Sequence, residues 1–318
     1  MSDTTDELVE RARSLDKGSV ARLISRFEDR RPHMAEHRAE VLAALDGAGV
    51  APTGTIIGVT GTPGSGKSTL LSRLTVDLLS DDDSRSIAVL AVDPSSQVSG
   101  GALLGDRTRM RYLPDERRLF FRSQASESDL GGLGPSTFQV CRLLTRLFDC
   151  VMIETVGIGQ SEADIRHLAD RVYLVLQPLG GDEVQFLKAG IIEVPDAFIL
   201  NKCDEPSSSA SYHQLRASMW LARPFDEEAP PIFRTSALTG EGLDELEADL
   251  IARIDTIGGA GLREREPYFF GRWVDDEWGR HGVGVLRERF GGAERFLADH
   301  GGYETAQAAF ADEVLRQP

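Results

Sequence analysis

The feature that most constrains this chain is a glycine-rich segment, Gly61-Thr62-Pro63-Gly64-Ser65-Gly66-Lys67-Ser68, which follows a strand-like run at residues 55–60. Its spacing is that of the phosphate-binding loop G-x-x-x-x-G-K-[ST], and an apolar helical pattern comes next. In such a loop the main-chain N–H groups approach phosphates, Lys67 supplies a charge for the β and γ oxygens, and Ser68 offers a hydroxyl to Mg²⁺. The segment predicts a nucleoside triphosphate site that uses Gly61, Gly64, Ser65, Gly66, Lys67, Ser68 and Thr69.

A second motif, about 140 residues later, predicts which base is bound. Asn201-Lys202-Cys203-Asp204 matches N-K-x-D, in which the aspartate accepts hydrogen bonds from the N1–H and the exocyclic amine of guanine. Adenine has neither donor, and each lost contact costs on the order of 1–3 kcal/mol, or ~10 to 100-fold in affinity. The segment 236–238 follows another strand-like run and can offer a main-chain N–H to the guanine O6. We expect a guanine site formed by Asn201, Lys202, Asp204, Ser236, Ala237 and Leu238.

Composition limits the classes of protein that fit. The chain has 318 residues and a formal net charge of −16, which argues against sequence-independent binding to nucleic acid or to an anionic membrane. We find no secretory signal and no run of eighteen apolar residues, and therefore expect a cytoplasmic protein. The three cysteines lack C-x-x-C spacing, so we expect reduced thiols.

The order of apolar patterns predicts an α/β fold. Residues 1–50 carry helical periodicity and indicate two or three helices. Within residues 51–257 further strands are expected at 86–92, 118–122, 150–154, 171–177, 196–201 and 231–235, with helices between most of them. This alternation predicts a P-loop NTPase domain with a mainly parallel sheet flanked by helices, and with ligands at the carboxyl ends of the strands.

Residues 258–318 form a helical segment that is rich in aromatic side chains. The segment holds nine of the 22 aromatic residues of the chain. Phe270, Trp273, Val274 and Trp278 fall on one helical face, which can pack on the same chain or serve as a dimerisation arm. The sequence leaves both alternatives open.

Three acidic residues are candidates for the metal side of the nucleotide site. Asp93 ends one expected strand, and Glu154 ends another, so both point towards the ligand edge of the sheet. Asp106 lies in a glycine-flanked loop and is either a further metal-side carboxylate or a helix cap. With Ser68, these residues are the expected Mg²⁺ ligands. Many GTPases have D-x-x-G where this chain has Glu154-x-x-Gly157, and we expect the N–H of Gly157 to sense the γ-phosphate.

Several longer segments carry a resemblance to a known family. They are residues 92–96, 104–110, 154–162, 181–183 and 188–191, together with the pair Arg30-Arg31. From about residue 8 to residue 250, the chain resembles the GTPases associated with methylmalonyl-CoA mutase, of the MeaB or ArgK type, within the SIMIBI class of P-loop proteins.

The resemblance implies a G-protein chaperone that hydrolyses GTP to GDP with Mg²⁺. Such proteins gate the loading of adenosylcobalamin, delivered by an adenosyltransferase, into a cobalamin-dependent acyl-CoA mutase, and they protect that enzyme. By resemblance, Lys67, Asp106, Glu154 and Gly157 serve hydrolysis, and a homodimer is implied. Residues 177–188 match a third switch loop from which Lys188 moves towards the phosphates, although Lys188 is otherwise an ordinary solvated lysine. Residues 177–182 depart from the family pattern, which leaves open which acyl-CoA mutase is served.

Missing residues argue against other functions. A metal-insertion GTPase needs clustered imidazole or thiolate ligands, and only His33 and His37 have a suitable spacing. The cobalamin motif D-x-H-x-x-G is absent, so we expect no tightly bound cobalamin. A nucleotide-dependent kinase of a transport protein needs a base beside an acceptor hydroxyl, which no segment resembles. Only Gln160, Arg107 and Arg109 are candidates to orient water or stabilise charge, so we expect slow hydrolysis without a partner.

Overall fold

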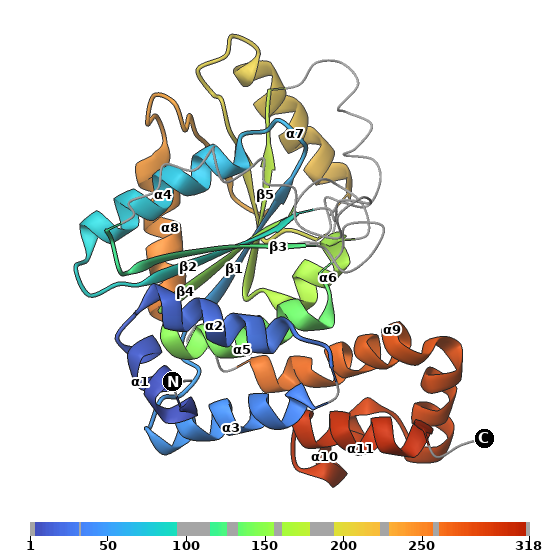
Figure 1. Cartoon of the computed structure of the whole chain (residues 1–318). Coiled ribbons are helices and arrows are strands. Elements are labelled where there is room, and N and C mark those ends of the chain that lie inside the picture. Colours follow the sequence, from blue (N-terminus) through green and yellow to red (C-terminus); the bar gives the residue numbers. More distant parts are fainter. Residues whose placement is uncertain are drawn as a thin grey trace. The chain divides into compact units, whose positions relative to one another are not determined.

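The computed structural model describes residues 4–31, 33–93, 115–125, 133–155, 161–178, 194–222, 229–256 and 261–315. The chain divides into two compact units (Figure 1). The sheet unit comprises Thr55–Leu133 and Phe148–Gly258. The helical unit comprises Met1–Gly54, Gly134–Leu147 and Gly259–Pro318, so the terminal segments share a unit with a helix from the middle of the sequence.

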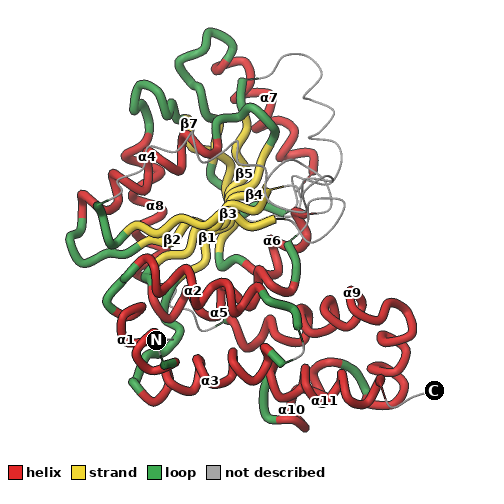
Figure 2. The backbone as a smooth tube through the Cα atoms, in the orientation of Figure 1, coloured by secondary structure: helices red, strands yellow, loops and turns green. Residues whose placement is uncertain are grey.

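The described residues of the sheet unit form a seven-stranded sheet in the order β3-β2-β4-β1-β5-β6-β7. Every pairing is parallel. With its strands side by side and helices around them (Figure 2), the sheet confirms the predicted α/β fold. The strands occur where apolar runs predicted them, within three residues at each end. Their bounds are β1 Thr55–Gly61, β2 Ile87–Asp93, β3 Leu119–Ala125, β4 Cys150–Thr155, β5 Arg171–Leu176, β6 Ala197–Leu200 and β7 Ile232–Arg234.

Helices cover both faces of this sheet. On one face, α4 (Lys67–Asp81) and α8 (Leu243–Thr256) bury leucines against strand residues such as Ile57 and Val89. On the other face, α6 (Ser161–Leu168) contacts β1, and α7 (Ser208–Ala222) packs Leu215 and Met219 on β5 and β6. Parallel strands that are covered on both sides have near-continuous apolar sequences. The strands could therefore be predicted from apolar runs that show no alternation of polar and apolar residues. The carboxyl ends of the strands are left for a ligand.

The helical unit contains seven helices among its described residues. They are α1 Thr5–Arg13, α2 Lys17–Glu28, α3 Met34–Gly47, α5 Pro135–Leu147, α9 Leu262–Phe290, α10 Ala293–His300 and α11 Tyr303–Leu315. Two starts are fixed by side-chain caps: Thr4 forms a capping box with Glu7, and Asp16 accepts from the main-chain N–H of Ser19. Such caps satisfy N–H groups that the first helical turn leaves unpaired.

Aromatic side chains form the centre of the helical unit. Phe138 of α5 stacks on Phe269 of α9 with ring centroids 4.5 Å apart, and Phe270 contacts Tyr303 and Phe310 of α11. Phe270 and Val274 are fully buried within the chain. The aromatic face of the C-terminal segment therefore packs on its own chain. The sequence pattern did not indicate a break in α9, yet its backbone departs from helical geometry at Gly279, with φ of 56°.

A search of the described helices for a membrane span was negative: none combines sufficient length with sufficient apolar character.

Candidate nucleotide-binding site

The phosphate-binding loop lies at the carboxyl end of β1, the strand that pairs with β4 and β5. Gly61 has φ of 148°, and a Cβ there would stand 2.0 Å from the carbonyl oxygen of Val175 on β5. No other residue can place the chain so close to its neighbour. The buried Ser65 closes the loop, because its hydroxyl donates to the carbonyl of Thr62 at 2.8 Å. The glycine at the start of the motif thus has a steric cause in this fold.

Lys67 begins α4 and is 7% exposed. Its Nζ donates to the carbonyl oxygens of Gly61 and Thr62 at 2.9 and 3.0 Å. Two main-chain acceptors of the loop therefore hold the ammonium inside the loop. A buried ammonium at the start of a helix, where main-chain N–H groups are unpaired, is an arrangement that binds phosphate.

The metal side of the site joins α4 to β4. The hydroxyl of Ser68 donates to Oε1 of Glu154 at 2.7 Å, and Glu154 is 4% exposed. Asp93 is the last residue of β2, which pairs with β4 so that Val92 lies opposite Thr155. A hydroxyl and a buried carboxylate are hard oxygen donors of the kind that Mg²⁺ prefers, so the residues present fit this ion. The predicted residues Asp106, Gly157 and Lys188 lie outside the described residues, as do Arg107, Arg109 and Gln160.

Asn201 links the base motif to the phosphate-binding loop, a role that the motif alone did not indicate. Its Nδ2 donates to the carbonyl of Ser65 at 2.8 Å, and its Oδ1 accepts from the N–H of Ala237 at 3.1 Å. Asn201 is 1% exposed. A Cβ on Gly66, where φ is +86°, would stand 2.6 Å from Asn201 Nδ2, so the loop and the amide are closely fitted. One amide therefore aligns the phosphate-binding loop, the end of β6 and the segment after β7.

The other residues of the base motif surround this amide. Lys202 has a positive φ of 57°, and its Nζ donates to Oε1 of Gln177 at 2.7 Å. Asp204 is exposed, and the N–H of the intervening Cys203 donates to the carbonyl of Thr235 at 2.9 Å. These bonds tie residues 201–204 to β5 and to the end of β7.

The segment after β7 is a tight turn with one exposed tip. The buried Ser236 accepts at Oγ from the N–H of Thr239, and its own N–H donates to the carbonyl of Glu241. The N–H of Ala237 is occupied by Asn201, whereas the N–H of Leu238 has no partner among the described residues. Leu238 is 83% exposed. Of the two, Leu238 therefore has the main-chain donor that is available to a base.

Two threonines near the loop were missed by sequence reasoning. Thr60 and Thr155 directly follow the register pair Val59 and Glu154, so they lie on neighbouring strands. Both hydroxyls are buried, and neither has a hydrogen-bond partner within the described chain; the hydroxyl of Thr62 shares this property. Unpaired buried hydroxyls are costly and cluster where a ligand or a second conformation satisfies them. The sequence feature that could have indicated Thr60 and Thr155 is a threonine at the end of an otherwise apolar strand.

Neither the histidine pair, His33 and His37, nor the thiol of Cys203 in the base motif forms a metal site among the described residues. The rings of His33 and His37 have centroids 6.3 Å apart, and Nδ1 of His37 lies 3.4 Å from Glu40. Over the described ranges, no group of three or more His, Cys, Asp or Glu residues could hold a metal ion. Burial, with a smaller effect of Glu241, raises the pKa of Cys203, so this thiol stays protonated at neutral pH.

Comparison with known proteins agrees with this geometry. A protein of Pyrococcus horikoshii, provisionally named a GTPase, is 40% identical over 248 residues, which are 76% of this chain and 75% of that protein. GTPase ArgK of Escherichia coli is 34% identical over 249 residues, 76% of this chain and 74% of ArgK. The mitochondrial methylmalonic aciduria type A homolog of Caenorhabditis elegans is 33% identical over 66% of this chain and 53% of its own length.

A solved structure and a family model complete the comparison. The crystal structure of a LAO/AO transport system kinase superposes with a TM-score of 0.63, covering 99% of both chains at 22% identity, a likeness that concerns the fold alone. The model of the methylmalonyl Co-A mutase-associated GTPase MeaB matches residues 20–268. With a phosphate-binding loop, a guanine motif and relatives named as GTPases, this chain belongs to the MeaB family of GTPases.

Proposed function

We propose that this GTPase is a cytoplasmic chaperone that gates the loading of adenosylcobalamin into a cobalamin-dependent acyl-CoA mutase and protects that enzyme. Support comes from the family description, which names a mutase-associated GTPase, and from the name of the nematode relative. The observation that supports its GTPase part is the link made by Asn201, which joins the base motif to the phosphate-binding loop. In such a site the position of the phosphate-binding loop is coupled to that of the guanine motif.

Each end of the nucleotide has its own residues in this proposal. Asp204 reads the N1–H and the exocyclic amine of guanine, and the N–H of Leu238 donates to O6. Lys67 and the loop N–H groups hold the β- and γ-phosphates, and Gly157 senses the γ-phosphate.

Ser68, Asp93, Asp106 and Glu154 would hold Mg²⁺, which neutralises phosphate charge during hydrolysis. With Ser68 bound to Glu154 in the structure, this carboxylate is already aligned with the start of α4. The proposal assigns no tightly held cobalamin to the chain. The cofactor is cargo that passes from an adenosyltransferase to the mutase, whose identity within the acyl-CoA mutases the proposal leaves open.

Hydrolysis is expected to be slow until a mutase binds. Partner binding would order the third switch loop and bring Lys188 towards the phosphates, which supplies a charge that the isolated chain does not position. A homodimer formed through the C-terminal segment is part of the proposal. Because the aromatic face of that segment is already used within the chain, exposed residues of these helices would have to form the contact.

The test is GTP hydrolysis by the purified chain, measured alone and with candidate cobalamin-dependent mutases, with ATP as the control nucleotide. Stimulation of GTP turnover at least tenfold by one mutase, with no ATP turnover, would support the proposal. Rapid turnover by the chain alone would contradict it. If no adenosylcobalamin-dependent acyl-CoA mutase changes GTP turnover, the chain is still a GTPase, but the proposal that it serves such a mutase is contradicted.

A further inference from the structure

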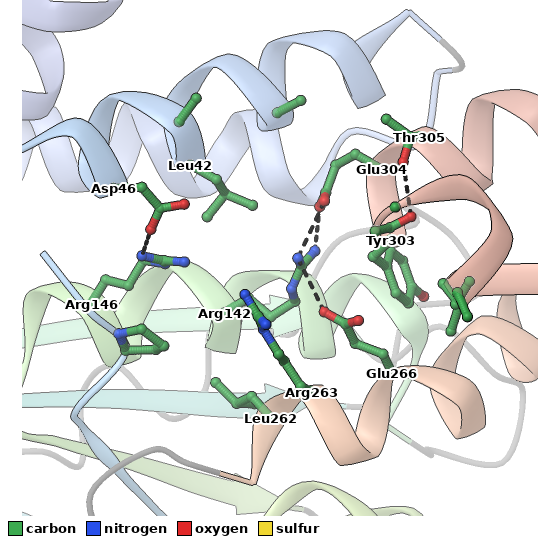
Figure 3. Close-up of a pocket in the computed structure, with 17 residues that line it drawn as sticks. Leu42, Asp46, Arg142, Arg146, Leu262, Arg263, Glu266, Tyr303, Glu304 and Thr305 are labelled. Atoms are coloured by element: carbon green, nitrogen blue, oxygen red, sulfur yellow. Dashed lines mark hydrogen bonds and ion pairs between the residues drawn. The ribbon is translucent and has the colours of Figure 1, made fainter. Parts of the chain in front are cut away.

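Two cavities of the helical unit differ in how their arginines are neutralised. The larger, of about 530 Å³, is lined by α5 arginines that have carboxylate partners (Figure 3). Arg142 bonds to Glu304 and lies 3.4 Å from Glu266, while Arg146 bonds to Asp46 at 2.5 Å. The charges of these two side chains are matched by the protein itself, so this cavity gives no reason to expect a charged ligand.

The smaller cavity, of about 100 Å³, lies among the start of α3, the middle of α9 and α11. Three arginines line it, Arg30, Arg31 and Arg38, whereas Glu277 is the one acidic residue among its described lining. Arg30 and Arg31 each lie beside a carboxylate, that of Asp276 and that of Asp29. The charge of this cavity that is left for an anion is therefore that of Arg38.

Arg38 is the residue that most needs such an anion. It is 6% exposed, and its guanidinium donates to two neutral acceptors, the carbonyl of Asp29 at 2.9 Å and Oε1 of Gln307 at 3.0 Å. Its Nε has no partner, and no carboxylate lies within ion-pair distance of it among the residues that the structure describes. A buried charge without a counter-charge costs several kcal/mol in general, and an apolar side chain of the same size would avoid that cost.

Burial also lowers the pKa of Arg38, and only part of this effect is offset by the charge of Glu304. Glu304 cannot serve fully as the counter-charge, because its carboxylate is bonded to Arg142. The neighbouring charges of the unit therefore leave Arg38 under-compensated.

The two rim arginines differ from Arg38 in exposure. The side chains of Arg30 and Arg31 are 44% and 69% exposed. Arg30 lies 3.6 Å from Asp276, a partly exposed pair of the kind that contributes little to stability. Arg31 is held by Asp29. Both rim arginines thus have partners of their own, and the ion pair of Arg30 is the longer of the two.

We propose that this cavity is a binding site for a small oxyanion, a phosphate or carboxylate group, held between Arg38 and Arg30. The cavity has room for about three water molecules, which matches one such group and excludes a whole nucleotide. Trp273 and Trp278 line the same cavity, with ring centroids 4.8 Å apart, and give it an apolar wall. Arginine recognises both groups through paired N–H donors.

The test uses the full chain saturated with Mg²⁺ and a non-hydrolysable GTP analogue, so that phosphate cannot bind at the nucleotide site. Binding of inorganic phosphate and of acetate is measured by equilibrium dialysis at constant ionic strength. We expect one anion per chain with a dissociation constant of about 1 mM or lower. Phosphate alone, acetate alone or both would support the site and identify its group. Binding of neither would overturn the proposal.

Variants locate the bound anion. Arg38→Met keeps an unbranched apolar stem and removes the charge, and is expected to weaken binding at least tenfold. Arg30→Gln at the rim is expected to weaken it about threefold, and it serves as the test if Arg38→Met does not fold. Arg287→Gln is the matched control, because this exposed arginine of α9 does not line the cavity. Equal binding by the wild type and both cavity variants would overturn the proposal.

Discussion

Buried polar groups serve different purposes in the two units of this molecule. In the sheet unit, Asn201, Ser65 and Lys67 bond to main-chain atoms of loops. In the helical unit, Arg142 bonds to carboxylates of helices far away in sequence. The first arrangement holds loops for a ligand, and the second fixes helices against each other. This comparison separates residues expected to change nucleotide binding from residues expected to change stability.

The largest expected effect is on the stability of the helical unit. Arg142→Met leaves the buried carboxylate of Glu304 and the partly buried one of Glu266 without their cation, and should lower the free energy of unfolding by about 3–5 kcal/mol at pH 8. Burial already raises the pKa of Glu266. Without the cation Glu266 should take up a proton more readily, so the loss should shrink towards pH 5.

Urea unfolding followed by tryptophan fluorescence measures this loss. In a Trp220→Phe background the two remaining tryptophans, Trp273 and Trp278, both report on the helical unit. Arg287→Gln, an exposed change, should alter stability by no more than about 0.5 kcal/mol. A loss below about 1 kcal/mol for Arg142→Met, or a loss that does not depend on pH, would contradict the assignment of Arg142 to helix packing.

The second effect is on nucleotide affinity. Asn201→Ala removes the donor to Ser65 and the acceptor of the Ala237 N–H, and should weaken GDP binding about 100-fold, because two buried hydrogen bonds are lost. A fluorescent GDP analogue provides the titration. The urea midpoint of unfolding of the helical unit, followed by its tryptophan fluorescence, should stay unchanged. If affinity is unchanged, Asn201 does not position the phosphate-binding loop.

A smaller effect is expected on the metal side. Glu154→Gln keeps a hydrogen-bond acceptor for Ser68 and removes a charge, so Mg²⁺-dependent hydrolysis should fall about 10-fold. Binding of GDP in the presence of a chelator should change less than about twofold, because no metal takes part. Equal hydrolysis rates of the wild type and Glu154→Gln at limiting Mg²⁺ would show that Glu154 does not take part in metal binding.

The smallest effect concerns a face of the sheet unit away from the loop. Burial, with the charge of Asp77, raises the pKa of Glu247 on α8 to about 7. Because the folded state holds this proton more tightly, wild-type stability should decrease as pH rises from 4.5 to 7. Glu247→Gln should therefore stabilise the chain by about 1 kcal/mol at pH 8, after allowance for partial exposure, and be neutral at pH 4. Thermal unfolding at both pH values is the measurement, and equal shifts would show that Glu247 titrates normally.

Local patterns predicted much of the sheet unit. The apolar runs and the phosphate-binding motif are contiguous in sequence, so strands, loop and the start of α4 could be placed from sequence alone. The link through Asn201 could not, because it depends on where β6 and β7 end relative to the loop. A signal was nevertheless present: Asn201 is the single asparagine of the chain, and three of its four lysines, Lys67, Lys188 and Lys202, lie in the predicted motifs or switch.

The helical unit was less predictable. The sequence pattern found the aromatic face of α9 but left its partner open, since periodicity reports a face and not what covers it. Phe138 belongs to a helix that lies between two strands in sequence, yet it stacks on Phe269 more than 100 residues later. The unmatched charge of Arg38 likewise appears only when all neighbouring carboxylates are in place.

The measurement that tests the central claim most directly is a competition titration with GDP, ADP and xanthosine diphosphate on the wild type and Asp204→Asn. The account predicts that the wild type binds GDP at least about 100-fold more tightly than ADP, and that the variant prefers the xanthine nucleotide. Equal affinity for GDP and ADP, or a variant with unchanged preference for GDP, would contradict the assignment of this edge of the sheet to guanine recognition.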